Sequence, residues 1–156
     1  MPILELQQLA AALMPGKRLM GLDIGSKTVG LALSDVNRTI ATPLITLHRV
    51  KFSKDAAELE ALIDKHDVGG LVLGLPISMD GREGPRCQST RQFAANLLER
   101  RDIAIAFQDE RMSTAAVERF LIGEADMTRK RRAQVVDRAA AAYILQGALD
   151  AMALQA

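Results

Sequence analysis

The chain has 156 residues, of which 49% are hydrophobic and 25% are charged, and its formal net charge is +1. This length and composition are typical of one globular domain with a substantial core. The near-neutral charge gives no global basis for binding nucleic acid or a membrane surface, so a polyanionic partner would need a local basic patch. Aromatic residues make up only 3% of the chain, which excludes base stacking as the main mode of recognition.

The content of cysteine and histidine fits a reducing compartment. The single cysteine, Cys87, cannot form an intrachain disulfide, and the two histidines, His48 and His66, are too few for a zinc-like cluster. Polar residues interrupt the apolar N-terminus and no basic segment precedes it, so we expect no signal peptide. No apolar run approaches the length of a membrane span. We therefore expect a cytoplasmic protein without a membrane partner.

Hydrophobic periodicity predicts an N-terminal helix followed by an α/β domain. Apolar residues recur at helical spacing over 3–14, before the break at Pro15-Gly16, so we interpret residues 1–16 as an accessory helix and 17–156 as the domain proper. Strands are predicted at 18–24, 28–35, 39–48, 70–75 and 103–108. Further helices are predicted at 53–66, 86–100, 114–122 and 134–152. The first three strands form an antiparallel meander, and the later alternation of strands with helices favours parallel pairing.

The predicted fold class is therefore α/β, with a five-stranded mixed sheet flanked by helices. In such a sheet a functional site belongs at the carboxyl ends of the central parallel strands. The strand at 70–75 is apolar throughout, which indicates that it is buried on both faces.

Acidic residues lie where the predicted strands end and where the last helix begins. Asp23 is near the end of the first strand and is flanked by glycines, which would let a ligand or a backbone segment approach closely. Asp109 or Glu110 follows the fifth strand. Asp137 falls in the first turn of the predicted last helix, on the face that must pack against the sheet. Because a buried carboxylate is costly unless it is paired or binds a cation, we expect these acids to share one site.

Carboxylate clusters of this kind bind Mg²⁺ or Mn²⁺ through hard oxygen ligands. Two such ions about 3.5 to 4 Å apart would activate a water and stabilise the leaving oxygen of a phosphodiester. Structural alternatives remain open for two of the acids. Asp23 would also suit a cap at a hairpin corner, and Asp137 would also complement the dipole of its helix.

Two kinds of phosphate-binding loop are alternatives to the metal site. The segment 21–28 contains Lys27 but has Ser26 where a Walker-type loop needs glycine. The segment Asp23-Ile24-Gly25 also resembles the first phosphate loop of the actin and sugar-kinase superfamily. Those proteins need a second such loop after a second strand, and the only candidate, residues 67–70, precedes its strand. An ATP-binding protein is therefore an alternative with less support.

Four motifs in this order resemble those of one family. They are Gly21-Leu22-Asp23-Ile24-Gly25 with Val29-Gly30-Leu31-Ala32, Gly74-Leu75-Pro76 with Asp80-Gly81, Asp109-Glu110-Arg111-Met112-Ser113-Thr114, and Val136-Asp137-Arg138-Ala139-Ala140. Over residues 18–150 the chain resembles the YqgF or RuvX family of proposed pre-16S ribosomal RNA nucleases, also called Holliday-junction-resolvase-like proteins. Met112 stands where that family often has leucine, and residues 1–16 lie outside the resemblance.

The resemblance implies an RNase H-like fold and a cytoplasmic protein tied to ribosome maturation. It also implies that Asp23, an acid at 109–110 and Asp137 bind the metal ions. We therefore expect a metal-dependent nuclease that processes the 5′ end of pre-16S ribosomal RNA within a ribosome precursor. A Holliday-junction resolvase acting on branched DNA and a non-catalytic ribosome-assembly factor are the alternatives. The sequence is compatible with each of these substrates and with several oligomeric states.

Strand alternation favours Glu110 over Asp109 as the third ligand. In the strand before them, Ile103, Ile105 and Phe107 share one face with Asp109, and the small Ala104 and Ala106 share the other with Glu110. The alanine-rich last helix should pack over the small face, which is also the side of Asp23. Asp109 would then pair with Arg111 or cap the next helix.

Basic residues near the acids are candidates for contacts with nucleic acid. The stretch Arg129, Lys130, Arg131 and Arg132 is predicted to cross a loop before the last helix, where it would hold phosphates or simply be solvated. Lys27 and Arg111, beside the predicted metal ligands, are the other candidates.

Overall fold

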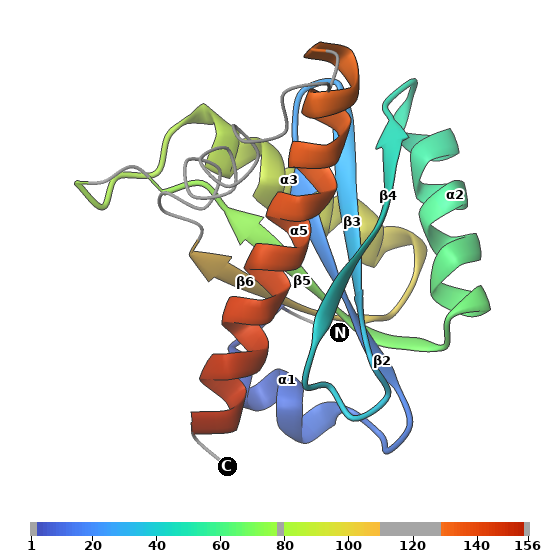
Figure 1. Cartoon of the computed structure of the whole chain (residues 1–156), viewed down its shortest axis with the longest axis vertical. Coiled ribbons are helices and arrows are strands. Elements are labelled where there is room, and N and C mark those ends of the chain that lie inside the picture. The colour runs from blue at the N-terminus through green and yellow to red at the C-terminus, as the bar shows by residue number, and fades with distance from the viewer. Residues whose placement is uncertain (1–2, 78–79, 110–128, 155–156) are drawn as a thin grey trace.

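The structure is a computed structural model that describes residues 3–77, 80–109 and 129–154, with the backbone alone described for 129–137 and 154. A mixed sheet has the order β1-β6-β5-β2-β3-β4, and helices cover both of its faces (Figure 1). The strands are β1 (Ile3–Leu4), β2 (Arg18–Ile24), β3 (Thr28–Ser34), β4 (Ala41–His48), β5 (Val68–Leu75) and β6 (Ala104–Asp109). The described helices are α1 (Leu6–Ala12), α2 (Phe52–Lys65), α3 (Pro85–Arg100) and α5 (Arg129–Leu154).

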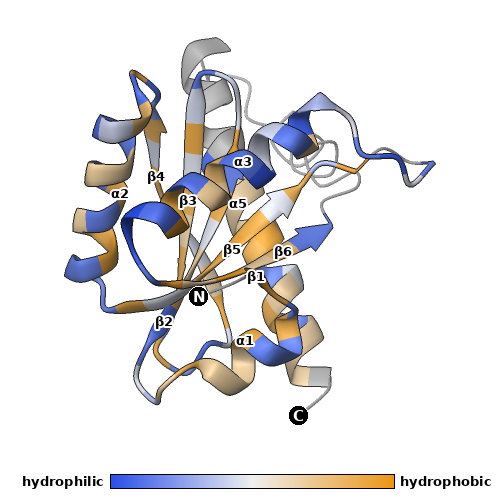
Figure 2. Cartoon of the chain, turned by 180° about the vertical axis from the view of Figure 1, so that it is seen from behind, coloured by the Kyte–Doolittle hydropathy of each residue, from blue (hydrophilic) through white to orange (hydrophobic). Residues whose placement is uncertain are grey.

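The pairing of the strands confirms the predicted α/β class. Strands β2, β3 and β4 form the antiparallel meander, while β5 runs parallel to β2 and β6 runs parallel to β5. Every residue of β5 except Gly69 is buried, and Figure 2 shows mostly apolar residues along this strand. The unbroken apolar run therefore did indicate a strand covered on both faces.

The N-terminal segment differs from its prediction. Residues Ile3–Leu4 form β1, which pairs parallel with β6 and raises the number of strands from five to six. Helix α1 begins only at Leu6, after the backbone N–H of Glu5 donates to the side-chain oxygen of Gln8 at 2.9 Å. A two-residue strand is too short to show a period of its own, so its apolar residues fit the pattern of the following helix.

The last helix also differs from its prediction. Helix α5 includes Arg129 to Leu154, so the prediction of a loop at 129–132 was wrong, as was a helix start at Gln134. Arginine and lysine favour helices about as much as leucine, and neither glycine nor proline interrupts this segment. The predicted helix at 114–122 lies outside the described residues. The other predicted strands and helices agree with the structure within two residues at each end.

Two hydrophobic cores lie on opposite faces of the sheet. On one face, α5 and α1 pack against side chains that include Leu19, Ala104 and Ala106. On the other, α2 and α3 pack against a larger cluster that includes Met20 and Leu22. Figure 1 shows α5 crossing the front of the sheet, and Figure 2 shows α2 and α3 on the back. Each strand therefore sends alternate residues to α5 and to the α2–α3 layer.

The close approach of α5 to the sheet depends on Gly21. A Cβ atom at that position would lie 2.8 Å from the carbonyl oxygen of Ala141 and 2.8 Å from the Cβ of Leu145. Only a residue without a side chain leaves room for this contact. The alanines of α5 therefore do pack over the small residues of the sheet, as the sequence predicted.

Candidate active site

Asp23 lies on the α5 side of the sheet, at the carboxyl end of β2. Leu19 packs in the α5 core and Gly21 touches α5 itself, and strand alternation gives Asp23 the same face. Its side chain is half-buried, and its partner across the sheet is Gly30 of β3. A carboxylate is thus held on a rigid strand at the edge where parallel strands end, which is the position predicted for the site.

The backbone of α5 brings residue 137 to the level of Asp23. The helix runs antiparallel to β2, with its N-terminal end near the carboxyl end of that strand (Figure 1). Gly21 lies against Ala141, and Asp23 is two residues further along β2, about 7 Å at the rise of a strand. Asp137 is four residues before Ala141, about 6 Å at the rise of a helix. The side chain of Asp137 lies outside the described part of the structure.

The length of α5 removes one interpretation of Asp137. Because α5 includes Arg129, Asp137 is eight positions into the helix rather than in its first turn. The effect of the helix dipole falls off within the first turn, so a role as a charge that complements the dipole does not apply. The residues predicted to share its face, including Ala141 and Ile144, are indeed buried against the sheet.

The end of β6 lies at the same edge as Asp23. Leu22 is level with Leu73 of β5, and Leu73 is level with Phe107 of β6. Leu22, Leu73 and Phe107 therefore lie in one row across the sheet. Asp23 is one residue beyond this row on β2 and Asp109 is two residues beyond it on β6, and these two strands lie about 10 Å apart with β5 between them. Asp109 is exposed and pairs with Leu75 in the sheet.

The predicted alternation along β6 is confirmed as far as Gln108. Phe107 packs on the α2–α3 face, where the guanidinium of Arg91 lies 5.0 Å from the centre of its ring. Gln108 faces α5, because its Nε2 would lie 3.2 Å from a Cβ placed at Gly147. Asp109 follows on the side of Phe107 in this alternation. Glu110 and Arg111 lie outside the described residues.

The donor set suits a divalent cation of the Mg²⁺ type. Asp23 is the half-buried carboxylate of the predicted set, and oxygen donors of this kind are those that Mg²⁺ and Mn²⁺ prefer. Within the part of the chain that the structure describes, His, Cys, Asp and Glu side chains form no cluster of three. The other predicted ligands, Glu110 and Asp137, have their side chains outside that part.

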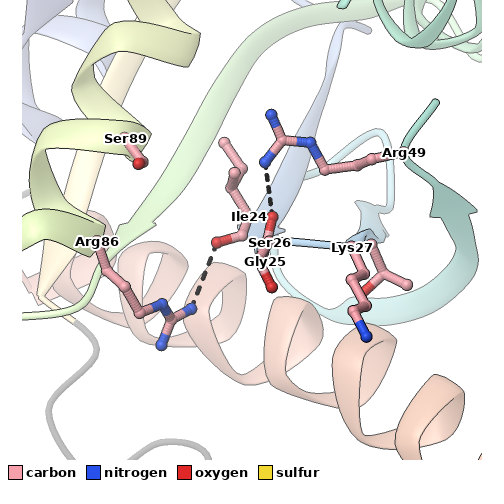
Figure 3. Close-up of a pocket in the computed structure, with 8 residues that line it drawn as sticks. Ile24, Gly25, Ser26, Lys27, Arg49, Arg86 and Ser89 are labelled. Atoms are coloured by element: carbon pink, nitrogen blue, oxygen red, sulfur yellow. Dashed lines mark hydrogen bonds between the residues drawn. The ribbon is translucent and has the colours of Figure 1, made fainter. Parts of the chain in front are cut away.

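A pocket of about 550 Å³ lies beside this end of β2 (Figure 3). It is lined by the turn from Ile24 to Thr28 together with Arg49, Arg86 and Ser89. The Nη1 of Arg49 donates to the carbonyl oxygen of Gly25 at 2.7 Å, and the Nη2 of Arg86 donates to that of Ile24 at 3.3 Å. Both arginines therefore fix the turn that follows Asp23, and Lys27 stands on the same turn.

The sequence analysis named Lys27 as a candidate but not Arg49 or Arg86, which line the same pocket. The available signal was the position of Arg86 in the first turn of α3, directly after Pro85. A cation is disfavoured there by the positive end of the helix dipole, so its presence needed an explanation.

The start of α3 is held by a two-fold hydrogen bond in which Arg91 donates to Glu83 at 2.8 Å through each of two nitrogens. This contact keeps the pKa of Glu83 below its usual value.

The family model described as RuvX, Holliday junction resolvase, matches residues 17–151. The chain belongs to the RuvX family. A relative from Rhodospirillum rubrum is 64% identical over 152 residues, covering 97% of this chain and 94% of the relative. One from Paramagnetospirillum magneticum is 65% identical over 150 residues, covering 96% of each chain. Both carry the name "Putative pre-16S rRNA nuclease".

Solved structures of resolvases share the fold of this RuvX chain. The fowlpox virus resolvase with Holliday junction DNA has a TM-score of 0.53 at 9% identity, covering 86% of this chain and 98% of the resolvase. T. thermophilus RuvC with a Holliday junction substrate has a TM-score of 0.51 at 14% identity, covering 86% of this chain and 94% of RuvC. These likenesses confirm the RNase H-like fold. Among the described helices, none has the length and apolar character needed to span a membrane.

Proposed function

We propose that this protein is a divalent-metal-dependent nuclease that processes the 5′ end of pre-16S ribosomal RNA in the cytoplasm. The observation that carries the proposal is the half-buried Asp23 on the α5 face of the sheet, at the level of the backbone of Asp137. Membership of the RuvX family supports the nuclease class. The names of the relatives support the ribosomal substrate.

In this proposal Asp23, Glu110 and Asp137 hold Mg²⁺ or Mn²⁺, with Asp109 beside them. The bound cation would supply an activated water and stabilisation of the leaving oxygen of the phosphodiester. Asp23 is positioned by a strand whose neighbours fix it on both sides, so its carboxylate needs little reorganisation to receive a ligand. Three carboxylates held close together repel one another, and a bound divalent cation would relieve that repulsion. The site should therefore bind such cations strongly.

Basic residues around these acids would bind the phosphates of the substrate. Lys27 is on the turn that follows Asp23, and Arg111 follows the acids at the end of β6. The described part of α5 begins with Arg129, Lys130, Arg131 and Arg132, which lie within about two turns before Asp137. Contacts of this kind position a nucleic acid without reading its sequence. Structured RNA within a ribosome precursor is the substrate that we propose.

A second candidate is cleavage of branched DNA. It is favoured by the description of the matching family model as a Holliday junction resolvase. Both functions use the same acids and the same chemistry, so the substrate distinguishes them. A ribosome-assembly factor that binds RNA without cleaving it would use the basic residues alone.

The decisive experiment is a cleavage assay with Mn²⁺ on a pre-16S RNA fragment and on a four-way DNA junction. We expect the protein to cleave the RNA in the correct region only when the cation is present. Asp23→Asn and Asp137→Asn should each abolish cleavage while the circular dichroism spectrum stays unchanged. Without metal, both variants should melt no lower than the parent, because each removes one of several like charges.

Glu58→Gln is the matched control, since Glu58 is an exposed acid on α2, and it should cleave like the parent. Preferential cleavage of the junction would favour the resolvase. Full cleavage by both purified Asp variants would overturn the proposed metal site and leave the binding factor as the better interpretation.

A further inference from the structure

The pocket beside Asp23 concentrates positive charge that no described acid compensates. Lys27, Arg49 and Arg86 all line it, and none of the three forms a salt bridge with any residue in the described part of the chain. Arg91, which follows on the same helix as Arg86, pairs instead with Glu83. An open pocket with cations that form no salt bridge, at the edge proposed to bind nucleic acid, is suited to an anion.

The two arginines keep donors available after they have fixed the turn. A guanidinium carries five N–H donors, and the hydrogen bonds to the Ile24 and Gly25 carbonyls use one nitrogen of each arginine. Figure 3 shows Arg86 and Arg49 reaching this turn from opposite sides, with Ser89 on the same side as Arg86. Arg49 is further held over the ring of Phe93, 5.6 Å from its centre. The cations are thus positioned before any ligand arrives, which lowers the entropic cost of binding one.

The placement of Arg86 is unfavourable for stability by itself. It occupies the first turn of α3, which has no acidic residue, so its charge faces the positive end of the helix dipole. An anion in the pocket would interact favourably with Arg86 and with the dipole together. A residue selected only to clamp the turn would need no charge, because an amide side chain can also donate to a carbonyl.

The pocket and Asp23 flank the same strand end on opposite faces of the sheet. Ile24 packs on the α2–α3 face and lines the pocket, and the preceding residue, Asp23, belongs to the α5 face. A nucleic-acid strand that crosses this edge of the sheet would touch both. We propose that the pocket binds a backbone phosphate of the substrate, next to the phosphodiester held at Asp23, through Arg49, Arg86, Lys27 and the hydroxyl of Ser89. This inference rests on the proposed function.

The test measures binding without cleavage. A fluorescein-labelled pre-16S RNA fragment and a labelled four-way DNA junction are titrated in EDTA at several KCl concentrations, with fluorescence anisotropy as the readout. For Lys27→Gln/Arg86→Gln we expect affinity for the favoured substrate to fall on the order of tenfold or more, as expected when a charged hydrogen bond is removed. The slope of log affinity against log salt should decrease by about 1 if one phosphate is no longer bound.

Two controls separate a phosphate contact from general charge and from folding. Lys54→Gln/Lys65→Gln removes the same charge from exposed positions of α2 and should leave the slope close to that of the parent. Arg86→Lys keeps the charge and should recover part of the affinity. All variants are compared at temperatures where circular dichroism shows them folded.

A neutral methylphosphonate placed at successive single positions of the favoured substrate then locates the contact. For the parent, the methylphosphonate should lower the affinity at one position close to the cleavage site. For Lys27→Gln/Arg86→Gln, the modified and unmodified substrates should bind equally at that position. Equal losses at that position in both proteins would overturn the proposal. So would salt slopes that do not differ, because the arginines would then only clamp the turn.

The pocket could instead bind the phosphate group of a small free anion, and this alternative is tested separately. Inorganic phosphate and adenosine monophosphate are titrated into the parent and the variant, with NMR shifts of the turn at 24–28 as the readout. Saturable binding of either to the parent, with unchanged nucleic-acid affinity in the variant, would overturn the proposal in favour of a small-molecule site.

If the parent binds nucleic acid but never cleaves it, the proposed nuclease function fails while the pocket result stands. If the parent cleaves and the pocket variant binds normally, only the pocket proposal fails.

Discussion

Asp35, directly after β3, stabilises the chain reversal before β4 through its ionised carboxylate. The oxygens accept hydrogen bonds from the hydroxyl of Thr39 at 2.7 Å and from the backbone N–H groups of Thr39 at 2.7 Å and Ile40 at 3.1 Å. The bond from the Thr39 hydroxyl is the main cause that lowers the pKa of Asp35 from 3.8 to about 2. A carboxylate whose pKa is lower in the folded state stabilises the fold only where it is ionised.

The stabilisation of the fold by Asp35 is lost as the pH falls, because its pKa is lower in the folded state. The contribution of Asp35 is complete above its unfolded pKa of 3.8 and disappears as the pH falls through its folded value of about 2. We therefore expect Asp35→Asn to melt below the parent at pH 7, and the gap to close between pH 4 and pH 2. Thermal unfolding across this range measures the gap, with Glu58→Gln as the control. A gap of constant size at every pH would contradict the assignment to Asp35.

Gly21 and Gly147 lie in the same interface between the sheet and α5, yet they should respond oppositely to an added methyl group. At Gly21 the new Cβ would lie 2.8 Å from the backbone of Ala141 and 2.8 Å from the Cβ of Leu145, and neither can move without shifting the helix. We expect Gly21→Ala to destabilise the protein by about 1 to 3 kcal/mol, as overpacking does.

At Gly147 the nearest atom is the flexible end of Gln108, 3.2 Å away, and alanine favours the helix by up to about 1 kcal/mol. We therefore expect Gly147→Ala to be neutral or stabilising. Denaturant unfolding of both variants measures the two free energies. A Gly21→Ala variant as stable as the parent would show that α5 is free to move away from β2.

At the scale of elements, the alternation along β6 leads to a prediction of the third metal ligand. Continued beyond Phe107 and Gln108, the alternation predicts that Glu110, which lies outside the described residues, belongs to the α5 face. We expect Glu110→Gln to lose both cleavage and Mn²⁺ affinity, and Asp109→Asn to retain most of each. Isothermal titration with Mn²⁺ and the cleavage assay measure the two properties. The opposite result would show that a bulge reverses the alternation after Asp109.

The elements that the sequence predicted well are those with a long, regular hydrophobic pattern. The strand β5 is an unbroken apolar run, and the helix α2 repeats its apolar residues at helical spacing. The two errors occurred where that signal is weak. β1 is only two residues long and depends on its pairing with β6, and the basic start of α5 carries no apolar stripe that would mark it as helix.

At the scale of the whole molecule, the position of Asp23 could be predicted and the basic pocket could not. The rule that sites lie at the carboxyl ends of parallel strands needs only the order of strands and helices. The pocket is built from three separate segments, namely the turn after β2, Arg49 after β4 and the N-terminal part of α3. Nothing in the sequence relates Arg49 to Arg86, since only folding brings them together.

The charge of the whole chain is close to neutral, so any salt-dependent binding must come from local groups of cations. Arg129, Lys130, Arg131 and Arg132 form the densest such group in the sequence. Because they belong to α5 and not to a loop, their successive backbone positions are rotated by about 100° around the helix axis. A single substrate strand would then contact only some of them.

We therefore expect conversion of all four residues to glutamine to weaken binding of different RNA sequences alike. The salt slope should decrease by about 1 for each phosphate that the variant no longer binds, and by less than the four charges removed. Lys51→Gln/Lys54→Gln/Lys65→Gln, which removes exposed cations around α2, is the control for net charge. Fluorescence anisotropy in EDTA at several KCl concentrations measures both slopes. Identical slopes for the variant and the parent would mean that this stretch is only solvated, and the phosphates would have to be bound by the turn after β2 and its neighbours.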